Sequence, residues 1–254
     1  MEFFKEFDDY VSNYDFNNEN IKLKYYHSYR VMKLSEKYSK ILHFTEDDIL
    51  LARLIGLIHD IGRFPQYEIY KTFYDKKSVD HATLGNKVLF DEHFIERFTD
   101  NYNDYDVIRY AIDNHNKFEL EKTNDERALL HGKLIRDTDK IDILFLKHFF
   151  CDKISLGKDN VSQSVINSIV KHKPVLIENV KNSNDVMALY FAFAFDINND
   201  CTLDEVRKNV EKLYEKMEDK DIFYEIYNEV INYIDEREDK NVKHKIRSLK
   251  CWKR

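Results

Sequence analysis

The sequence predicts an all-α protein, and three observations support that fold class. Only 5 of the 254 residues are glycine and 2 are proline, whereas β-sandwiches and barrels need turn residues every few positions. Apolar residues recur at helical spacing along almost the whole chain, without an internal repeat or a low-complexity linker. Hydrophobic residues make up 43% of the chain, so a sizeable buried core is expected.

Helical periodicity divides the first part of the chain into helices with short connections. They are expected over residues 3–11, about 20–39, 45–60, about 80–97, 104–116 and 125–150. Thr45 opens a capping-box-like TEDD before the third helix, and Gly62 is predicted to stop that helix. Ser78 or Asp80 is expected to cap the fourth. Residues 63–77, which are rich in aromatic and charged side chains, are predicted to form a loop.

The second part of the chain also shows helical periodicity. Further helices are expected over residues 161–172, 185–195, 203–217 and 221–236. We expect residues 1–240 to form a single helical domain, with a core over about 20–150 and accessory helices over 151–240. The basic residues 241–254 are predicted to form a solvated terminal tail or helix, with a site for anionic partners as the alternative.

Charge and cysteine content limit the function and the compartment. The net charge of -7 disfavours a nucleic-acid-binding surface, but a bound cation would still allow a small anionic substrate. The cysteines Cys151, Cys201 and Cys251 have neither disulfide nor zinc-site spacing, which suits a reducing cytosol. The acidic N-terminus lacks a signal-peptide pattern, and no apolar run approaches the roughly 18 residues of a membrane span. We therefore expect a cytoplasmic protein without a membrane segment.

Polar residues interrupt the apolar faces of five predicted helices. The stretch LIGLIHDIGR places His59 and Asp60 at the inner end of a strongly apolar helix. A buried carboxylate needs a partner or a metal ion. The residues at comparable positions of the other helices are His27, His81, His115 and Asp139. Taken singly, each would more often be a satisfied core or capping residue. Together, imidazole and carboxylate groups projecting from several helices suit a transition-metal site.

In these residues the chain resembles the HD-domain superfamily of metal-dependent phosphohydrolases. The family pattern H…HD…D is matched by His27, His59-Asp60 and Asp139, and the contexts HDIGR and RDTDKID are also typical. The resemblance covers roughly residues 20–150. It implies an HD-domain helical bundle with additional C-terminal helices.

Two further histidines fall where binuclear members of the superfamily carry the ligands of a second metal. The resemblance implies that Asp60 bridges two ions, the second of which is held by His81 and His115. The implied ligands of the first ion are His27, His59, Asp60 and Asp139. The implied cofactor is a pair of divalent ions, with Mn or Fe favoured and Co, Ni, Zn or Mg also compatible.

The sequence lacks features that are typical of three branches of this superfamily. The cyclic-di-GMP phosphodiesterase branch carries a GYP motif shortly after the histidine that matches His115. Here the corresponding sequence is HNKFELEKT, which contains no glycine or proline, so that branch is disfavoured. We find no match to the extra segments of the deoxynucleotide triphosphohydrolases, nor to the acidic pair of the (p)ppGpp hydrolases.

The predicted reaction is hydrolysis of a phosphomonoester or phosphodiester by a metal-activated water. The substrate is a small anionic phosphate compound, with a nucleotide-like one favoured. Asp60 and Arg63 are the predicted catalytic residues. Arg63, Lys140 and Lys117 are predicted to bind the substrate, although each could equally be a surface residue paired with a carboxylate.

Two other functions stay open at this stage. HD-type di-iron oxygenases use the same six-ligand set, so ligand identity alone does not separate an oxygenase from a hydrolase. A non-catalytic metal- or nucleotide-binding module that kept the fold is the third reading. Its disadvantage is that such modules normally lose ligands, whereas all six are present here.

Overall fold

The computed structural model describes residues 3–251, and within them the side chains only as far as residue 240. Among these residues the structure contains helices and connecting turns but no strand, apart from an isolated bridge between Ile154 and Met217. The predicted all-α fold is therefore confirmed. The side chains of the predicted basic tail, residues 241–254, lie outside the described part of the chain.

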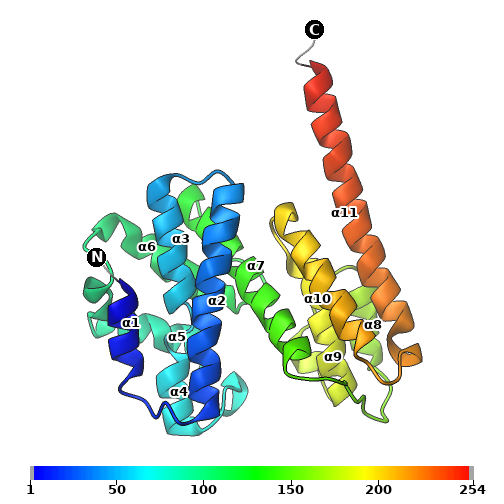
Figure 1. The fold of residues 1–254 in the computed structure, drawn as a ribbon, viewed down its shortest axis with the longest axis horizontal. Helices are drawn as coiled ribbons and strands as arrows, with labels where there is room; N and C mark the ends of the chain where they lie inside the picture. Colours follow the sequence, from blue (N-terminus) through cyan, green and yellow to red (C-terminus); the bar gives the residue numbers. More distant parts are fainter. Residues whose placement is uncertain (1–2, 252–254) are drawn as a thin grey trace. The chain divides into compact units, whose positions relative to one another are not determined.

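The chain divides into two compact units, Met1–Asp142 and Ile143–Arg254 (Figure 1). We describe each unit by itself. The prediction of one domain over residues 1–240, with accessory helices over 151–240, stays a prediction.

The first unit is a bundle in which α2 and α3 lie side by side along most of their length (Figure 1). Its α-helices are α1 (Phe3–Val11), α2 (Glu19–Ile41), α3 (Glu46–Ile58), α4 (Arg63–Tyr70), α5 (His81–Asn86), α6 (Tyr105–His115) and the first part of α7 (Glu126–Phe149). Single turns of 3-10 helix at Asp75–Lys77, Phe94–Arg97 and Tyr102–Asp104 complete the unit. A continuous apolar core joins these helices, and Phe7, Leu57 and Phe64 are fully buried in it.

Side-chain caps explain why several helices begin where they do. The hydroxyl of Thr45 accepts a hydrogen bond from the backbone N–H of Asp48, which confirms the predicted start of α3. The carboxylate of Asp80, not Ser78, caps α5 by accepting from the N–H of Thr83. Because His81 directly follows this cap, the cap fixes the place of that histidine at the start of its helix.

The prediction of a loop over residues 63–77 is wrong for its first half, which forms α4. Gly62 has an ordinary right-handed conformation, with φ of -68°, so it does not end the helical path as predicted. Pro65 falls in the first turn of α4, where backbone N–H groups have no partner within the helix in any case. The helix ends instead at Lys71, which adopts a left-handed conformation.

The continuous helix predicted over about 80–97 is also wrong. α5 passes into a π-helical turn at Lys87–Asp91, and the chain breaks at His93, which is left-handed. Leu89 and Ile95 are both buried, although residues six apart on an unbroken α-helix point about 120° away from each other. The break therefore allows both side chains to enter the core.

The second unit is helical as well. It contains α8 (Gln163–Val170), α9 (Ser183–Phe191), α10 (Leu203–Glu215) and α11 (Tyr224–Cys251), with 3-10 turns at Ile177–Asn179, Ala192–Asp196, Asp200–Thr202 and Asp221–Phe223. The sequence predicted an α-helix up to residue 195, but its last turn is a 3-10 helix. Phe191, Val210 and Phe223 are fully buried and form part of the core of this unit.

Candidate metal centre

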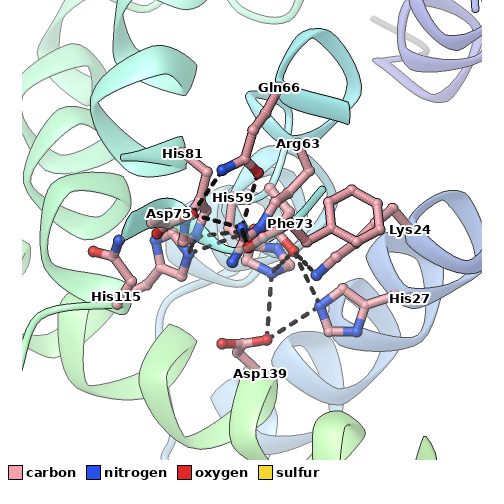
Figure 2. Close-up of polar contacts among 12 residues, drawn as sticks. Lys24, His27, His59, Arg63, Gln66, Phe73, Asp75, His81, His115 and Asp139 are labelled. Atoms are coloured by element: carbon pink, nitrogen blue, oxygen red, sulfur yellow. Dashed lines mark hydrogen bonds and ion pairs between the residues drawn. The ribbon is translucent and has the colours of Figure 1, made fainter. Parts of the chain in front are cut away.

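The six residues singled out in the sequence meet inside the first unit (Figure 2). His27 lies in the middle of α2, and His59 and Asp60 form the turn directly after α3. His81 begins α5, and His115 ends α6. The sixth residue, Asp139, lies on α7. All six are buried, with at most 8% of each residue exposed.

Asp60 stands between two groups of ligand atoms. Its Oδ2 atom is 3.4 Å from Nε2 of His27 and 3.6 Å from Nε2 of His59. Its Oδ1 atom is 3.4 Å from Nε2 of His81 and 3.6 Å from Nε2 of His115. One carboxylate thus turns one oxygen to each pair of histidines. This is the arrangement that a carboxylate bridging two ions requires.

Asp139 completes the first group. Its Oδ1 atom is 3.1 Å from Nε2 of His27 and 3.6 Å from Nε2 of His59. The imidazole of His27 and the carboxylate of Asp139, which are more than a hundred residues apart in the sequence, are therefore neighbours. His27, His59 and Asp139 form one set of atoms close enough to hold an ion, and His59, Asp60 and His115 form another.

Hydrogen bonds on the outer nitrogen fix the orientation of each imidazole. Nδ1 of His59 donates to the carbonyl of Gly56 at 2.9 Å, and Nδ1 of His115 donates to the carbonyl of Ile112 at 2.6 Å. A carbonyl oxygen can only accept, so Nδ1 of each of these two rings carries a proton, and in the neutral form of such a ring the lone pair lies on Nε2. The outer partners of His27 and His81 are carboxylates, those of Asp142 and Asp75, at 2.6 and 2.7 Å. Such outer partners are typical of metal-bound histidines.

Two features of the inner nitrogens show that a cation fits here. Nε2 of His27 and Nε2 of His59 are buried without a hydrogen-bond partner, which is costly unless a ligand satisfies them. Nε2 of His81 and Nε2 of His115 are 2.9 Å apart. When both rings carry their protons on Nδ1, two lone pairs face each other at this distance, and a shared cation would relieve their repulsion. The mixed nitrogen and oxygen donor set suits Mn, Fe, Co, Ni or Zn.

The electrostatics of the site favour positive charge at its centre. Burial raises the pKa of Asp60, but Lys24 and the surrounding histidines outweigh burial and hold this pKa well below its usual value. Burial likewise raises the pKa of Asp139, but the close approach of His27 and His59 outweighs it. Both carboxyl groups are therefore ionised. A divalent ion would neutralise two buried negative charges.

The pKa values of the histidines in the site shift in different directions. Burial and the charge of Lys24 lower the pKa of His27, but the close carboxylates of Asp139, Asp142 and Asp60 outweigh them and raise it to about 10. Burial lowers the pKa of His59, and it lowers the pKa of His81 to about 4 in spite of the hydrogen bond to Asp75. A proton thus prefers His27, between the carboxylates, and a metal ion there would take the place of that proton.

Two glycines allow the helices to approach closely enough to build the site. A Cβ atom on Gly56 would lie 2.8 Å from Cα of Met32, so glycine permits the close contact between α3 and α2 that brings His59 to His27. A Cβ atom on Gly62 would lie 2.2 Å from the carbonyl oxygen of His81. Gly62 is therefore required for the close approach of α5, not for ending a helix.

The three predicted substrate-binding residues have different surroundings. Arg63 reaches the site, and its Nε atom is 3.5 Å from Oδ1 of Asp60. Lys117 lies at the surface and pairs with Glu121 at 2.7 Å, so the structure does not bring its ammonium group to the site. Lys140 follows Asp139 on α7 and is buried. Its predicted contact with the substrate stays a prediction.

Several residues at the site were missed in the sequence. The ammonium of Lys24 donates to Oδ2 of Asp60 at 2.6 Å. Asp142, which also pairs with Arg30 at 2.6 Å, holds His27 in place. Lys24 precedes His27 by three residues and Asp142 follows Asp139 by three, so helical spacing alone would have placed each of them on the ligand face.

The residue that supports His81 carried no sequence signal. Asp75 lies in the 3-10 turn between α4 and α5, inside the segment predicted to be a loop. Its Oδ2 atom accepts from His81, and its Oδ1 atom accepts from Arg63 at 2.8 Å and from Gln66 at 2.7 Å (Figure 2). Asp75 therefore links a candidate ligand of the second ion to the arginine beside Asp60.

The described residues thus form an all-helical fold with a buried group of histidines and carboxylates that could hold divalent metal. Residues 25–144 match the family model of the HD domain, and the match includes all six candidate ligands. The chain thus carries an HD domain. HD domains bind divalent metals, and most of their superfamily are metal-dependent phosphohydrolases.

Neither the comparison with curated proteins nor that with solved structures gave a match. Within the described residues, no helix combines the length and the apolar character needed to cross a bilayer.

Proposed function

We propose that this protein is a metal-dependent hydrolase of a small phosphomonoester or phosphodiester, and that His27, His59, Asp60, His81, His115 and Asp139 hold two ions. The observation that carries the proposal is the position of Asp60, whose two oxygens face different pairs of inward-pointing Nε2 atoms. Two-metal sites are used for displacements at phosphorus, where the attacking and the leaving oxygen both need charge stabilisation.

The residues of the chain itself would bind and orient the phosphate. When bound, the ions would supply Lewis acidity and lower the pKa of a water molecule. Lys24 and Arg63 bring positive charge to the edge of the site, next to both oxygens of Asp60. Their side chains are only about 15% exposed, so their charges would act on a phosphate with little screening by water. This concentration of positive charge favours an anionic substrate.

The direct test measures two quantities on the same protein samples: metal content, and the hydrolysis of phosphomonoesters and phosphodiesters followed by the alcohol released. Asp60→Asn removes the charge that would serve both ions, so we expect loss of bound metal and a loss of turnover on the order of a thousandfold. His81→Asn removes a candidate ligand of the second ion only, and we expect it to reduce the metal content from two ions to one. Wild-type metal content and turnover in Asp60→Asn would refute the proposal.

A matched control is available in the same unit. His93 is exposed and has a left-handed backbone, which asparagine tolerates well. His93→Asn therefore makes the same chemical change as His81→Asn outside the site. We expect it to leave metal content and turnover unchanged.

The same samples discriminate between a hydrolase and a di-iron oxygenase. A hydrolase cleaves its phosphate ester without oxygen and with Mn as the metal. An oxygenase requires iron and consumes O₂ in proportion to the product formed. Hydrolysis of a panel of nucleotides, simple phosphomonoesters and phosphodiesters should therefore proceed equally well under anaerobic conditions. A strict requirement for O₂ would favour the oxygenase instead.

A further inference from the structure

Two cationic side chains flank Asp60, and they are held in different ways. The NH1 group of Arg63 donates to Oε1 of Gln66, to the carbonyl of Phe73 and to Oδ1 of Asp75, at 2.9, 2.7 and 2.8 Å. These three acceptors fix the guanidinium. Lys24 instead donates a hydrogen bond to Oδ2 of Asp60, and its ammonium lies 5.5 Å from the centre of the Phe73 ring.

The oxygen that Lys24 contacts is the one that faces the first ion site. Oδ2 of Asp60 is 2.6 Å from Nζ of Lys24 and within 3.6 Å of the Nε2 atoms of both His27 and His59. An ion bound by these two histidines would use the same oxygen and would repel an ammonium group so close to it. Lys24 and the ion are thus competitors for Asp60.

A second partner would be within reach of the Lys24 ammonium group when an ion displaces it from Asp60. The Lys24 side chain is 15% exposed, more than the side chains of Asp60 and His27, so it lies at the outer edge of the site. The guanidinium of Arg63 is 5.8 Å from the same Phe73 ring that Lys24 contacts. An anion entering beside this ring would meet both cations. An ammonium released from Asp60 is free to pair with it.

We propose that Lys24 exchanges partners: it pairs with Asp60 before metal binding, and with a phosphate group of the substrate once metal is bound. This inference rests on the proposed function, because it gives Lys24 the role of recognising the phosphate. It predicts that loss of the lysine charge has opposite effects on two affinities. Metal binds more tightly because its competitor is gone, whereas phosphate binds more weakly. A purely structural lysine would weaken both.

The test uses the full chain, stripped of metal and then titrated. Mn²⁺ is titrated into the metal-free protein, and inorganic phosphate is then titrated into the Mn-loaded protein, both by calorimetry. For Lys24→Met we expect the Kd for Mn²⁺ to fall about tenfold and the Kd for phosphate to rise about tenfold, the size of one hydrogen bond to a charged group. Lys24→Arg keeps the charge and should restore phosphate binding.

Two further variants guard against trivial explanations. Lys33→Met makes the same change at an exposed position of α2 and should leave both affinities unchanged. Lys24→Gln removes the charge but keeps a hydrogen-bond donor for Asp60. It can therefore replace Lys24→Met in both titrations if Lys24→Met does not fold. As for Lys24→Met, we expect its Kd for Mn²⁺ to fall and its Kd for phosphate to rise. An unchanged or weaker Mn²⁺ affinity, or a phosphate affinity within twofold of wild type, would overturn the inference.

Failure of the proposed function would look different. If the Mn- or Fe-loaded wild type hydrolysed neither the phosphomonoesters nor the phosphodiesters of the panel, the hydrolase proposal would fall. The binding titrations do not depend on turnover, so they would still decide whether Lys24 changes partners.

Discussion

Asp60 in the first unit and Asp185 in the second are both buried carboxylates, yet their partners differ in kind. Asp185 accepts from the backbone N–H and the hydroxyl of Ser162, both at 2.7 Å, and from the N–H of Lys181 at 2.9 Å. Asp60 is surrounded by side chains from five different elements, and the Nε2 atoms of His27 and His59 near it have no hydrogen-bond partner.

The residue before Asp185 follows the same pattern of local satisfaction. The side-chain amide of Asn184 donates to the carbonyls of Gly157 and Asp159, and its oxygen accepts from the N–H of Gly157. These two residues tie the segment before α8 to the start of α9. A buried polar cluster that is saturated by nearby backbone groups holds the chain in shape. One that leaves inward-facing lone pairs unsatisfied has a ligand to bind.

The largest expected contrast is the response to metal. A ligand that binds only the folded state at one hundred times its Kd adds about 2.7 kcal/mol to the free energy of unfolding. We therefore expect saturating Mn²⁺ to raise the melting temperature of the wild type by several degrees, and to have no such effect on Asp60→Asn. Asp185→Asn should respond to Mn²⁺ as the wild type does. Calorimetry with and without a chelator measures these melting temperatures. If Mn²⁺ still stabilised Asp60→Asn, the claim that only the cluster around Asp60 binds metal would be wrong.

The second contrast concerns stability without metal. In Asp185→Asn, an amide NH₂ would face a backbone N–H or a hydroxyl that now donates to a carboxylate oxygen. We expect the free energy of unfolding to fall by about 2 kcal/mol, the cost of leaving a buried group unsatisfied. Faster hydrogen exchange at the amides of Ser162 and Lys181 should accompany the loss. Unchanged exchange at both amides would show that Asp185 does not hold this segment.

The third contrast lies within the site, between the candidate ligands of the first ion and those of the second. Asp75→Asn replaces the carboxylate that accepts the Nδ1 proton of His81 with a neutral amide, and Asp142→Asn makes the same change beside His27. Losing such an outer partner typically costs tenfold to a hundredfold in metal affinity. We expect Asp75→Asn to weaken the binding of the second Mn²⁺ ion and Asp142→Asn that of the first, in a two-step calorimetric titration. Equal weakening of both steps by either variant would contradict a two-centre site.

The smallest expected effect is the pH dependence of stability in the metal-free protein. Burial lowers the pKa of His81 to about 4, below its ordinary value of 6.5. Between these values the unfolded chain binds a proton at this residue that the folded chain does not, so His81 destabilises the folded state as the pH falls from about 6.5 to 4. Urea unfolding at pH 7 and pH 5 should therefore show a smaller loss in His81→Asn than in the wild type. Identical losses would mean that His81 does not titrate in this way.

The sequence was sufficient to predict the fold class and the six polar residues that meet in the candidate metal centre. Scarce glycine and proline and a helical apolar period allow few alternatives to a helical fold, and a histidine or aspartate that interrupts an apolar face can be found from spacing alone. Local capping was also predictable, as Thr45 at the start of α3 shows. The path of the chain was not predictable in the same way, because the left-handed turns at Lys71 and His93 have no glycine to mark them.

Only the tertiary structure decided how the ligand atoms are shared and supported. The periodicity of a helix says which face a side chain is on, but not which oxygen of Asp60 meets which histidine. It also gave no reason to single out Asp75, whose role depends on a turn that folds back over Arg63 and His81. The chemistry of the centre was encoded in residue types along the chain. Its geometry came from close helix packing at Gly56 and Gly62, which is a property of pairs of distant segments.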